Sequence, residues 1–300
     1  MENMPELKLS FIIITRNRVE ALMRLLESIE GQTYACRETI VVDDASGDGT
    51  AEVVKARYPH IRCLSQPERR GIGAGLDLGS SEATGEVWIE LDDDAWLASS
   101  GAAGEIARRF ADSPDLDVLC FKVEAPDGSV RRREIPRRDK RLPAVEAPIG
   151  YFLGGAVAFR ASSLRAVGGY PADIPFASWE NDVAFRMFKA GFRTVFAPGI
   201  RVVHEAIPSP YNTVEREANY VRNEIRLAAR YLPAPYAQVH AALWIALSLA
   251  QAARQGHLGG TVGAVREGLR GWGMLRADAR DRLTLGQTRR LSALSGRTWY

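Results

Sequence analysis

The chain has 300 residues, of which 46% are hydrophobic, so it is long enough to bury one large core or a core with an appendage. Its formal net charge of +2 lacks the basic excess of a dedicated nucleic-acid-binding protein, and nucleic acid is not an expected partner. The three cysteines form no CxxC pair, which argues against a disulfide framework or a cysteine zinc site, and the longest apolar run, about 241–253, is too short to span a bilayer.

The first 125 residues alternate short apolar runs with segments of helical period. Residues 9–15 are apolar without alternation, as expected for a strand buried on both faces. Apolar positions in 19–29 mark one face of a helix that Gly31 closes. Further strands are expected at 39–42, 61–64, 87–91 and 118–123, and a further helix at 50–58. This strand–helix repetition predicts an α/β fold with a mostly parallel sheet flanked by helices.

The second half of the chain is less regular. Residues 126–148 contain four prolines and a basic run at 131–141, and we expect an exposed loop there. Ordered structure is expected again at 151–160, with a helix near 180–190 and strands at 192–196 and 201–204. From residue 213 onward the pattern is helical, and residues 210–300 carry 13 Lys and Arg against 6 Asp and Glu.

Three expected strands end in clusters of polar residues. These clusters are Thr15-Arg16-Asn17, Asp43-Asp44 and Asp92-Asp93-Asp94. Ligands bind at the carboxyl ends of strands in open parallel sheets. Three adjacent carboxylates repel one another unless a cation offsets their charge, and an oxygen-rich site favours Mg²⁺ or Mn²⁺. The alternative for the aspartate run is a solvated turn that caps the following helix.

Seven motifs in order resemble the inverting family 2 glycosyltransferases of GT-A fold, over roughly residues 9–233. They are ITRNR (14–18), VVDDASGDGT (41–50), RRGIGAGLDLG (69–79), ATGEVWIELDDDA (83–95), YFLGGAVAFRASSLRAVGGYP (151–171), WENDVAFRMFKAGF (179–192) and PGIRVVHE (198–205). The resemblance implies a GT-A domain at 1–212, with a Rossmann-like nucleotide-sugar-binding half (about 7–125) and an acceptor half (149–212), followed by a helical C-terminal region at 213–300.

The same resemblance implies roles for individual residues in binding a nucleotide sugar and a divalent metal. Asp44 would hydrogen-bond the base edge; its alternative role is to accept backbone N–H groups of the Ser46-Gly47 turn. Asp94 would bind the metal that bridges the phosphates, and Asp92 would lie near the ribose or the metal. The remaining implied binding residues are Thr15, Arg16, Asn17 and Gly71 for the nucleotide sugar, Asp93 as a support, Gly154 and Gly155 for close approach of the sugar, and His204 as a further metal ligand.

By the same resemblance, Glu180 occupies the position at which the family carries its catalytic carboxylate. A second acid, Asp182, follows two residues later. An inverting transfer needs a base that removes the proton of the acceptor hydroxyl, and we expect Glu180 to be that base, with Asp182 as the other candidate. The alternative is that both acids only stabilise a helix N-terminus. The first loop, TRNRVEA, lacks the glycines of nucleotidyltransferases of similar fold, and the retained carboxylates argue against a non-catalytic relative.

The implied partners are a UDP-, dTDP- or GDP-sugar donor and an acceptor that is a carbohydrate, a lipid-linked intermediate or a small molecule. The N-terminus shows no signal peptide, and we expect a cytoplasmic location, with association at the inner face of the membrane left open. The basic run at 131–141 is either a solvated loop, an anion contact or a lid over the diphosphate. The C-terminal helices either pack under the active site, form a homodimer or contact a membrane surface.

Overall fold

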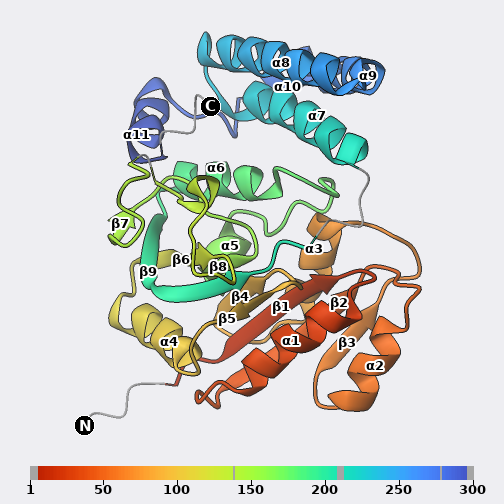
Figure 1. Ribbon diagram of the computed structural model, residues 1–300. Helices are drawn as coiled ribbons and strands as arrows, with labels where there is room; N and C mark the ends of the chain where they lie inside the picture. Colours follow the sequence, from red (N-terminus) through yellow and green to blue (C-terminus); the bar gives the residue numbers. More distant parts are fainter. Residues whose placement is uncertain (1–5, 138, 208–212, 278, 296–300) are drawn as a thin grey trace.

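A computed structural model of the protein describes residues 6–137, 139–207, 213–277 and 279–295. A central sheet is covered by helices on both faces, and a group of C-terminal helices lies beyond one of them (Figure 1). The strands are β1 (Leu9–Thr15), β2 (Arg37–Asp43), β3 (Arg62–Ser65), β4 (Val87–Leu91), β5 (Ala95–Leu97), β6 (Leu116–Glu124), β7 (Ala147–Pro148), β8 (Ala156–Arg160) and β9 (Arg193–His204). The helices are α1 (Val19–Glu30), α2 (Thr50–Arg57), α3 (Ile72–Glu82), α4 (Ala102–Asp112), α5 (Ala161–Ala166), α6 (Trp179–Ala190), α7 (Thr213–Tyr231), α8 (Tyr236–Gln255), α9 (Leu258–Leu269), α10 (Trp272–Ala277) and α11 (Leu285–Ser295), with a 3₁₀ turn at Arg132–Glu134.

The sheet has the strand order β3-β2-β1-β4-β8-β6-β9-β5, and β7 pairs with β9. Strands β3, β2, β1 and β4 run parallel to one another, as expected. Beyond β4 the sheet is mixed, because β8 lies antiparallel between β4 and β6. The described residues between β6 and β8 form no α-helix, and an antiparallel neighbour needs no helical crossover. The expected α/β class, with helices on both faces of an open sheet, is confirmed.

Two hydrophobic clusters cover the two faces of the sheet. Phe11 and Ile13 of β1 point into the cluster formed with α1 and α4, whereas Ile12 points into the cluster formed with α3, α5 and α6. Both faces of β1 are therefore buried, which is why its sequence shows no apolar–polar alternation. This packing directs the polar strand ends of β1, β2 and β4 to one edge.

Helix α3 did not stand out in the sequence because it contains three glycines. A Cβ added at Gly79 would lie 2.6 Å from Ile12 Cγ2, and one at Gly73 would lie 2.4 Å from the backbone oxygens of Pro171 and Ile174. Gly79 lets α3 pack closely on β1, and Gly73 lets it pack closely on residues 171–174. Helix α4 was also missed, and the two strands expected at 192–196 and 201–204 form the single strand β9.

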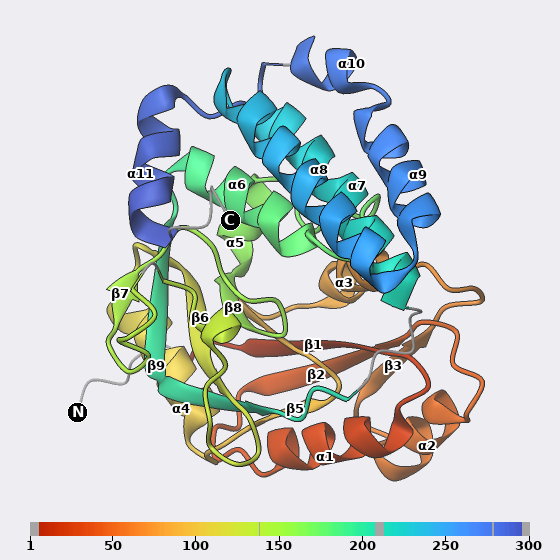
Figure 2. The ribbon, with the colours of Figure 1, turned by 45° about the horizontal axis from the view of Figure 1, so that its top comes forward.

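The C-terminal helices lie over α6, on the face of the sheet that carries α3 and α5 (Figure 2). Ala228 and Leu232 pack against Phe185 of α6 and join the two parts. Among the described residues, no helix combines the length and hydropathy needed to cross a bilayer.

Candidate active site

Asp92, Asp94 and His204 converge at the carboxyl end of β4. The buried strand β4 leads directly into the aspartates, and the pairing of β5 with β9 places His204 opposite Ala95, one residue after Asp94. His204 Nε2 lies 3.1 Å from Asp94 Oδ1 and 3.9 Å from Asp92 Oδ2. One ligand atom from each residue lies within 4.8 Å of the others, so the cluster is compact enough to hold a metal ion. Carboxylate oxygens with one imidazole fit Mn²⁺ or Mg²⁺.

The charges of these groups are strongly coupled. Burial and the neighbouring carboxylates raise the pKa of Asp92 to about 7, although His204 opposes this shift. Burial alone would lower the pKa of His204, but its hydrogen bond to Asp94 and the charge of Asp92 raise it. Burial alone would raise the pKa of Asp94, but the hydrogen bond from His204 and the charges of His204 and Arg18 hold it below its usual value. A bound cation would replace the protons of Asp92 and His204 as the positive charge that offsets the carboxylates.

Asp93 is not part of this cluster and is held by Thr15, the last residue of β1, and by Arg18 of the following loop. It accepts hydrogen bonds from Thr15 Oγ1 at 2.9 Å and Arg18 Nη1 at 2.9 Å. The same guanidinium group lies 3.3 Å from Asp94 Oδ2 and donates to the carbonyl of Ile207. Arg18 therefore holds Asp93 and Asp94 in position. Sequence reasoning missed it, although it is the last residue of the ITRNR motif.

The glycines of the segment 151–155 are required by packing. Gly155 has a positive φ of 73°, and a Cβ added to it would lie 2.2 Å from Asp92 Cγ. A Cβ on Gly154 would lie 2.6 Å from the ring of Trp179. The Gly155 N–H donates to Glu90 Oε1 at 3.1 Å. The buried Glu90, which sequence reasoning did not single out, thus anchors the turn that presses against Asp92.

Asp44 is buried and holds the loop before α3. Its carboxylate accepts hydrogen bonds from the N–H groups of Arg70 at 2.7 Å and Gly71 at 3.0 Å, and from Gln66 Nε2 at 3.0 Å. The Ser46 turn is instead held by Asp43, so the alternative contact that the sequence suggested for Asp44 is made by its neighbour. Asp44 nevertheless lines the cavity beside the aspartate run, as do Thr15 and Arg16.

Asn17 and Gly71 have local structural roles. Asn17 has a φ of 51°, and its side-chain oxygen accepts the N–H of Gly47 at 2.7 Å, which braces the loop after β2. Gly71 has a φ of 87°, and a Cβ there would lie 2.1 Å from the Pro175 carbonyl oxygen. Neither is among the residues found to line the two cavities of the site, although the adjacent Ile72 lines both.

Glu180 and Asp182 occupy different environments at the start of α6. Glu180 lines the same cavity as Asp92 and His204. Asp182 is only 1% exposed and accepts hydrogen bonds from Tyr231 Oη at 2.5 Å and from Arg186 Nε at 2.7 Å. Two positions apart on a helix, side chains do not share a face. Asp182 therefore links α6 to α7 and lies outside the lining of both cavities.

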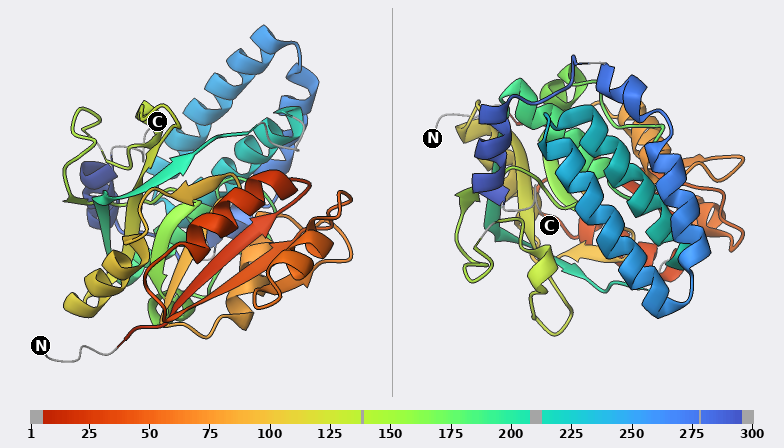
Figure 3. Two further views of the ribbon diagram at one scale, coloured as in Figure 1. Left: turned by 60° about the horizontal axis from the view of Figure 1, so that its bottom comes forward. Right: turned by 90° about the horizontal axis from the view of Figure 1, so that it is seen from above.

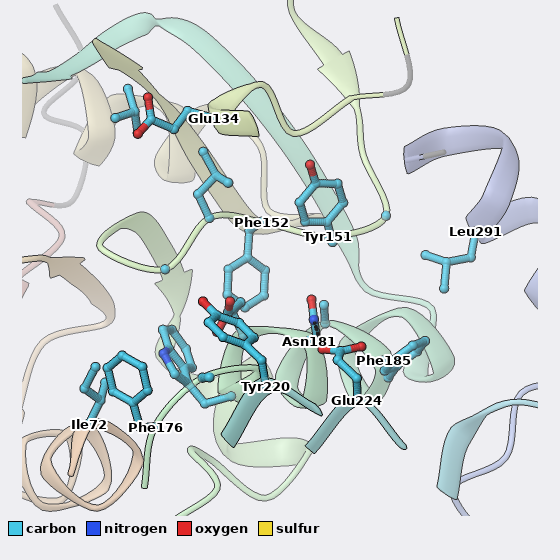
Figure 4. A pocket seen from close by; sticks show the side chains of 18 of the residues that line it. Ile72, Glu134, Tyr151, Phe152, Phe176, Asn181, Phe185, Tyr220, Glu224 and Leu291 are labelled. Carbon is cyan, nitrogen blue, oxygen red and sulfur yellow. Dashed lines mark hydrogen bonds between the residues drawn. The ribbon is translucent and has the colours of Figure 1, made fainter. Parts of the chain in front are cut away.

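Two cavities, of about 380 and 390 Å³, meet at Asp92 and His204. The polar cavity is lined by Thr15, Asp44 and the aspartate run together with arginines from three segments: Arg16, Arg18, Arg133 and Arg216. The aromatic cavity is lined by Glu180 and by residues of α7, α8 and α11, and Figure 4 shows Tyr220 and Glu224 of α7 and Leu291 of α11 around it. Its walls include the aromatic side chains of Tyr151, Phe152, Phe176, Trp179, Phe185, Tyr220 and Trp244.

The basic run at 131–141 contributes directly to the site. Arg133 lines the polar cavity, and Glu134 lines the aromatic cavity, 3.9 Å from His204 Nδ1. Of the readings left open for this run, these positions favour a segment that covers the site over a loop that is solvated throughout.

The family model for glycosyl transferase family 2 matches residues 10–168, more than half of the chain. The chain belongs to glycosyl transferase family 2. It is 26% identical over 234 residues to N-acetylglucosaminyl-diphospho-decaprenol L-rhamnosyltransferase of Mycobacterium tuberculosis, an alignment covering 65% of this chain and 75% of the relative. Family members are glycosyltransferases, and the enzyme class expected from the motifs is confirmed.

Solved glycosyltransferases share the fold of this family 2 member. The mannosyltransferase PcManGT of Pyrobaculum calidifontis, solved with GDP-Man and Mn²⁺, matches with a TM-score of 0.61 and 22% identity, over 96% of this chain and 84% of its own. GalNAc-T7, solved with UDP, GalNAc and Mn²⁺, matches with a TM-score of 0.61 and 18% identity, over 77% of this chain and 49% of its own. These matches confirm the GT-A fold.

Proposed function

We propose that this family 2 glycosyltransferase is an inverting, metal-dependent enzyme that transfers a sugar from a nucleoside diphosphate to an acceptor hydroxyl. The observation that carries the proposal is that Glu180 faces the same cavity as the metal-ligand cluster of Asp92 and His204. A donor diphosphate bound at that cluster would present its anomeric carbon towards Glu180. GDP-Man with Mn²⁺ in PcManGT supports this choice of donor and metal.

The donor would occupy the polar cavity, where its nucleotide would lie near Thr15, Arg16 and Asp44. The arginines Arg16 and Arg18 offset the negative charge that the diphosphate and the aspartate run would otherwise concentrate there, as arginine side chains do in other phosphate sites. Mg²⁺ or Mn²⁺, when bound by Asp92, Asp94 and His204, supplies a Lewis acid for the leaving diphosphate. Donor base and sugar are left open by these contacts.

Glu180 would act as the general base. The acceptor oxygen attacks the anomeric carbon, the bond from that carbon to the phosphate oxygen breaks, and the diphosphate leaves with the electron pair. The hydroxyl proton passes to the Glu180 carboxylate. Attack from the face opposite the diphosphate inverts the anomeric configuration. Asp182 is assigned to the support of α6, because its carboxylate is already bound by Tyr231 and Arg186.

The acceptor would occupy the aromatic cavity. Aromatic rings bind the faces of sugars and also apolar groups, and this cavity adds polar contacts from Asn181, Glu224 and His240. A lipid-linked acceptor is favoured over a soluble glycan or a secondary metabolite, because the Mycobacterium tuberculosis relative is named for a decaprenol-linked acceptor. A location at the inner face of the membrane accords with this choice.

The test is a panel of UDP-, dTDP- and GDP-sugars, with and without Mn²⁺, read out as thermal stabilisation of the chain. A bound donor stabilises the folded state by mass action, so the correct donor should raise the melting temperature only with the metal present. The product anomer, determined by NMR, then tests inversion. Donor-induced stabilisation that is equal with Mn²⁺ and with a chelator would contradict the metal assignment, and a retained anomeric configuration would contradict the mechanism.

A further inference from the structure

Helix α8 presents an apolar stripe on the outside of the molecule. Val239, Leu243 and Leu247 are 42%, 52% and 55% exposed, and their spacing of four places them along one side of the helix. We call these three residues the α8 stripe. The alanines beside it, at positions 242, 246 and 250, are also exposed. Seen from above, α8 crosses the outside of the C-terminal helices, with α9 alongside (Figure 3).

The neighbouring helices α9 and α10 also carry exposed apolar side chains. Leu258 and Leu269 of α9 are 45% and 43% exposed, and Met274 of α10 is 75% exposed. With the α8 stripe they make up six of the twelve large hydrophobic side chains that are exposed among the described residues. Concentration of exposed apolar side chains in one region marks an interaction surface more than a scatter of single residues does.

Arginines without an acidic partner border this surface. Arg254 lies two turns beyond Leu247 on the same side of α8, and Arg266 and Arg270 are exposed on and after α9. In the described part of the chain none of these three arginines forms an ion pair. The described acids of the whole C-terminal region already have basic partners: Glu215 with Arg69, Glu217 with His257, Glu224 with His240, Glu267 with Arg222 and Asp281 with Arg230. The surface is thus apolar and positively charged.

A second copy of the chain is a poor complement for this surface. In a two-fold dimer the same patch packs against itself, which would bring uncompensated arginines together without any described acid on α8 to offset them. An anionic lipid bilayer complements both features of the surface. Its apolar interior matches the exposed leucines, and its layer of phosphates matches the arginines. Helices with an apolar face and flanking arginines lie in the boundary between headgroups and acyl chains.

We propose that the α8 stripe docks on an anionic membrane surface, with Val239, Leu243 and Leu247 at the acyl boundary and Arg254, Arg266 and Arg270 at the lipid phosphates. His240 and Trp244 each follow a residue of the α8 stripe by one position, on the adjoining side of the helix, and both line the aromatic cavity. The membrane-docking stripe and part of the proposed acceptor site therefore belong to one helix. That consequence rests on the proposed function, since it takes the aromatic cavity as the acceptor site, whereas the docking itself requires neither donor nor metal.

The experiment measures sedimentation of the intact chain with phosphatidylcholine vesicles and with vesicles that also contain phosphatidylglycerol. We expect binding to the anionic vesicles only. Leu243→Glu with Leu247→Glu should lower the partition coefficient at least about tenfold, because two leucines that would insert at the acyl boundary are replaced by negative charges that the lipid phosphates repel. Each of Arg254→Gln, Arg266→Gln and Arg270→Gln should lower it about fivefold, and added salt should have the same direction of effect.

The matched control is Val53→Glu. Val53 is 37% exposed on α2, at the opposite end of the molecule in Figure 1, and this variant should bind vesicles as the unmodified chain does. Mn²⁺-dependent stabilisation by UDP, GDP and dTDP, measured on each variant, reports folding and the donor site separately from docking. No binding to anionic vesicles, or equal loss in the Val53 control, would overturn the proposal. A dimer that the α8 substitutions dissociate, without vesicle binding, would show that the stripe is a self-interface.

Discussion

Gly155 packs directly against the carboxylate of Asp92, so closely that no side chain larger than hydrogen fits between them. The backbone N–H of Gly155 donates a hydrogen bond to Glu90 of β4, which lies two residues before Asp92. The orientation of one proposed metal ligand therefore depends on a segment more than sixty positions later in the sequence. A substitution at Gly155 should therefore disturb the metal site in addition to straining the backbone.

Gly155→Ala should lower Mn²⁺-dependent binding of nucleoside diphosphate by at least about tenfold, because the added Cβ displaces Asp92. The matched control is Gly191→Ala, which has a similar φ of 83° but no atom within 4 Å of the new Cβ. It should cost about 1 kcal/mol of unfolding free energy and leave binding unchanged. Isothermal titration together with chemical denaturation distinguishes the two. Equal losses of binding in both variants would refute the role given to Gly155.

Metal affinity should rise with pH through the neutral range. Asp92, with a pKa raised to about 7, and His204, with a raised pKa, both hold protons that compete with the cation. As pH increases, the protons leave and Mn²⁺ binds more tightly. We expect a gain of about tenfold or more between about pH 6 and about pH 8. His204→Asn should weaken binding and flatten this profile, whereas a pH-independent affinity in the unmodified chain would be inconsistent with the assigned ligands.

Asn223 of α7 holds the turn that presents Glu180. Its amide donates to the carbonyls of Phe176 and Ala177, both at 3.0 Å, and Ala177 and Ser178 have positive φ values of 64° and 62°. Asn223→Ala should release this turn, lower kcat by about tenfold or more and cost roughly 1–3 kcal/mol of stability. Asn219→Ala serves as the control, because Asn219 accepts a hydrogen bond from Arg222 on the same helix. Turnover should be compared at saturating donor; equal kcat in both variants would exclude a positioning role.

Glu38 provides a test of the fold that does not involve the site. Partial burial alone would raise its pKa, but hydrogen bonds from Ser10, Thr84 and Lys8 outweigh burial and lower the pKa to about 2. A depressed pKa stabilises the folded state above the unfolded value near 4.5, and that stabilisation disappears as pH falls towards 2. Glu38→Gln should therefore cost about 1–2 kcal/mol at neutral pH and almost nothing near pH 2.

Denaturation at several pH values checks this sign, with Glu52→Gln on the exposed face of α2 as a control that should be close to neutral. A penalty for Glu38→Gln that grows as the pH falls would contradict the hydrogen-bonding account.

The sequence allowed the strand ends and the aspartate run to be predicted, because both depend on local pattern. The role of Arg18 could not be, since its contact with Asp93 joins residues 75 positions apart. The same holds for Glu134 beside His204 and for Glu90 beneath Gly155. Helical geometry indicates that Glu180 and Asp182 point to different sides, but only the packing of α7 identifies which one faces the cavity.

The glycine-rich helix α3 shows a second limit of sequence reasoning. Its low helix propensity is offset by close packing on β1 and β2, and that packing cannot be read from the segment alone.

The central claim is that one carboxylate, Glu180, takes the acceptor proton while the separate cluster of Asp92, Asp94 and His204 holds the donor through its metal. The most direct measurement is donor affinity and transfer rate for Glu180→Gln in one preparation, with Mn²⁺ present. We predict a donor Kd within about twofold of the unmodified chain and a transfer rate lower by roughly 10²–10⁴-fold. Transfer at a near-normal rate would contradict the assignment of Glu180 as the base.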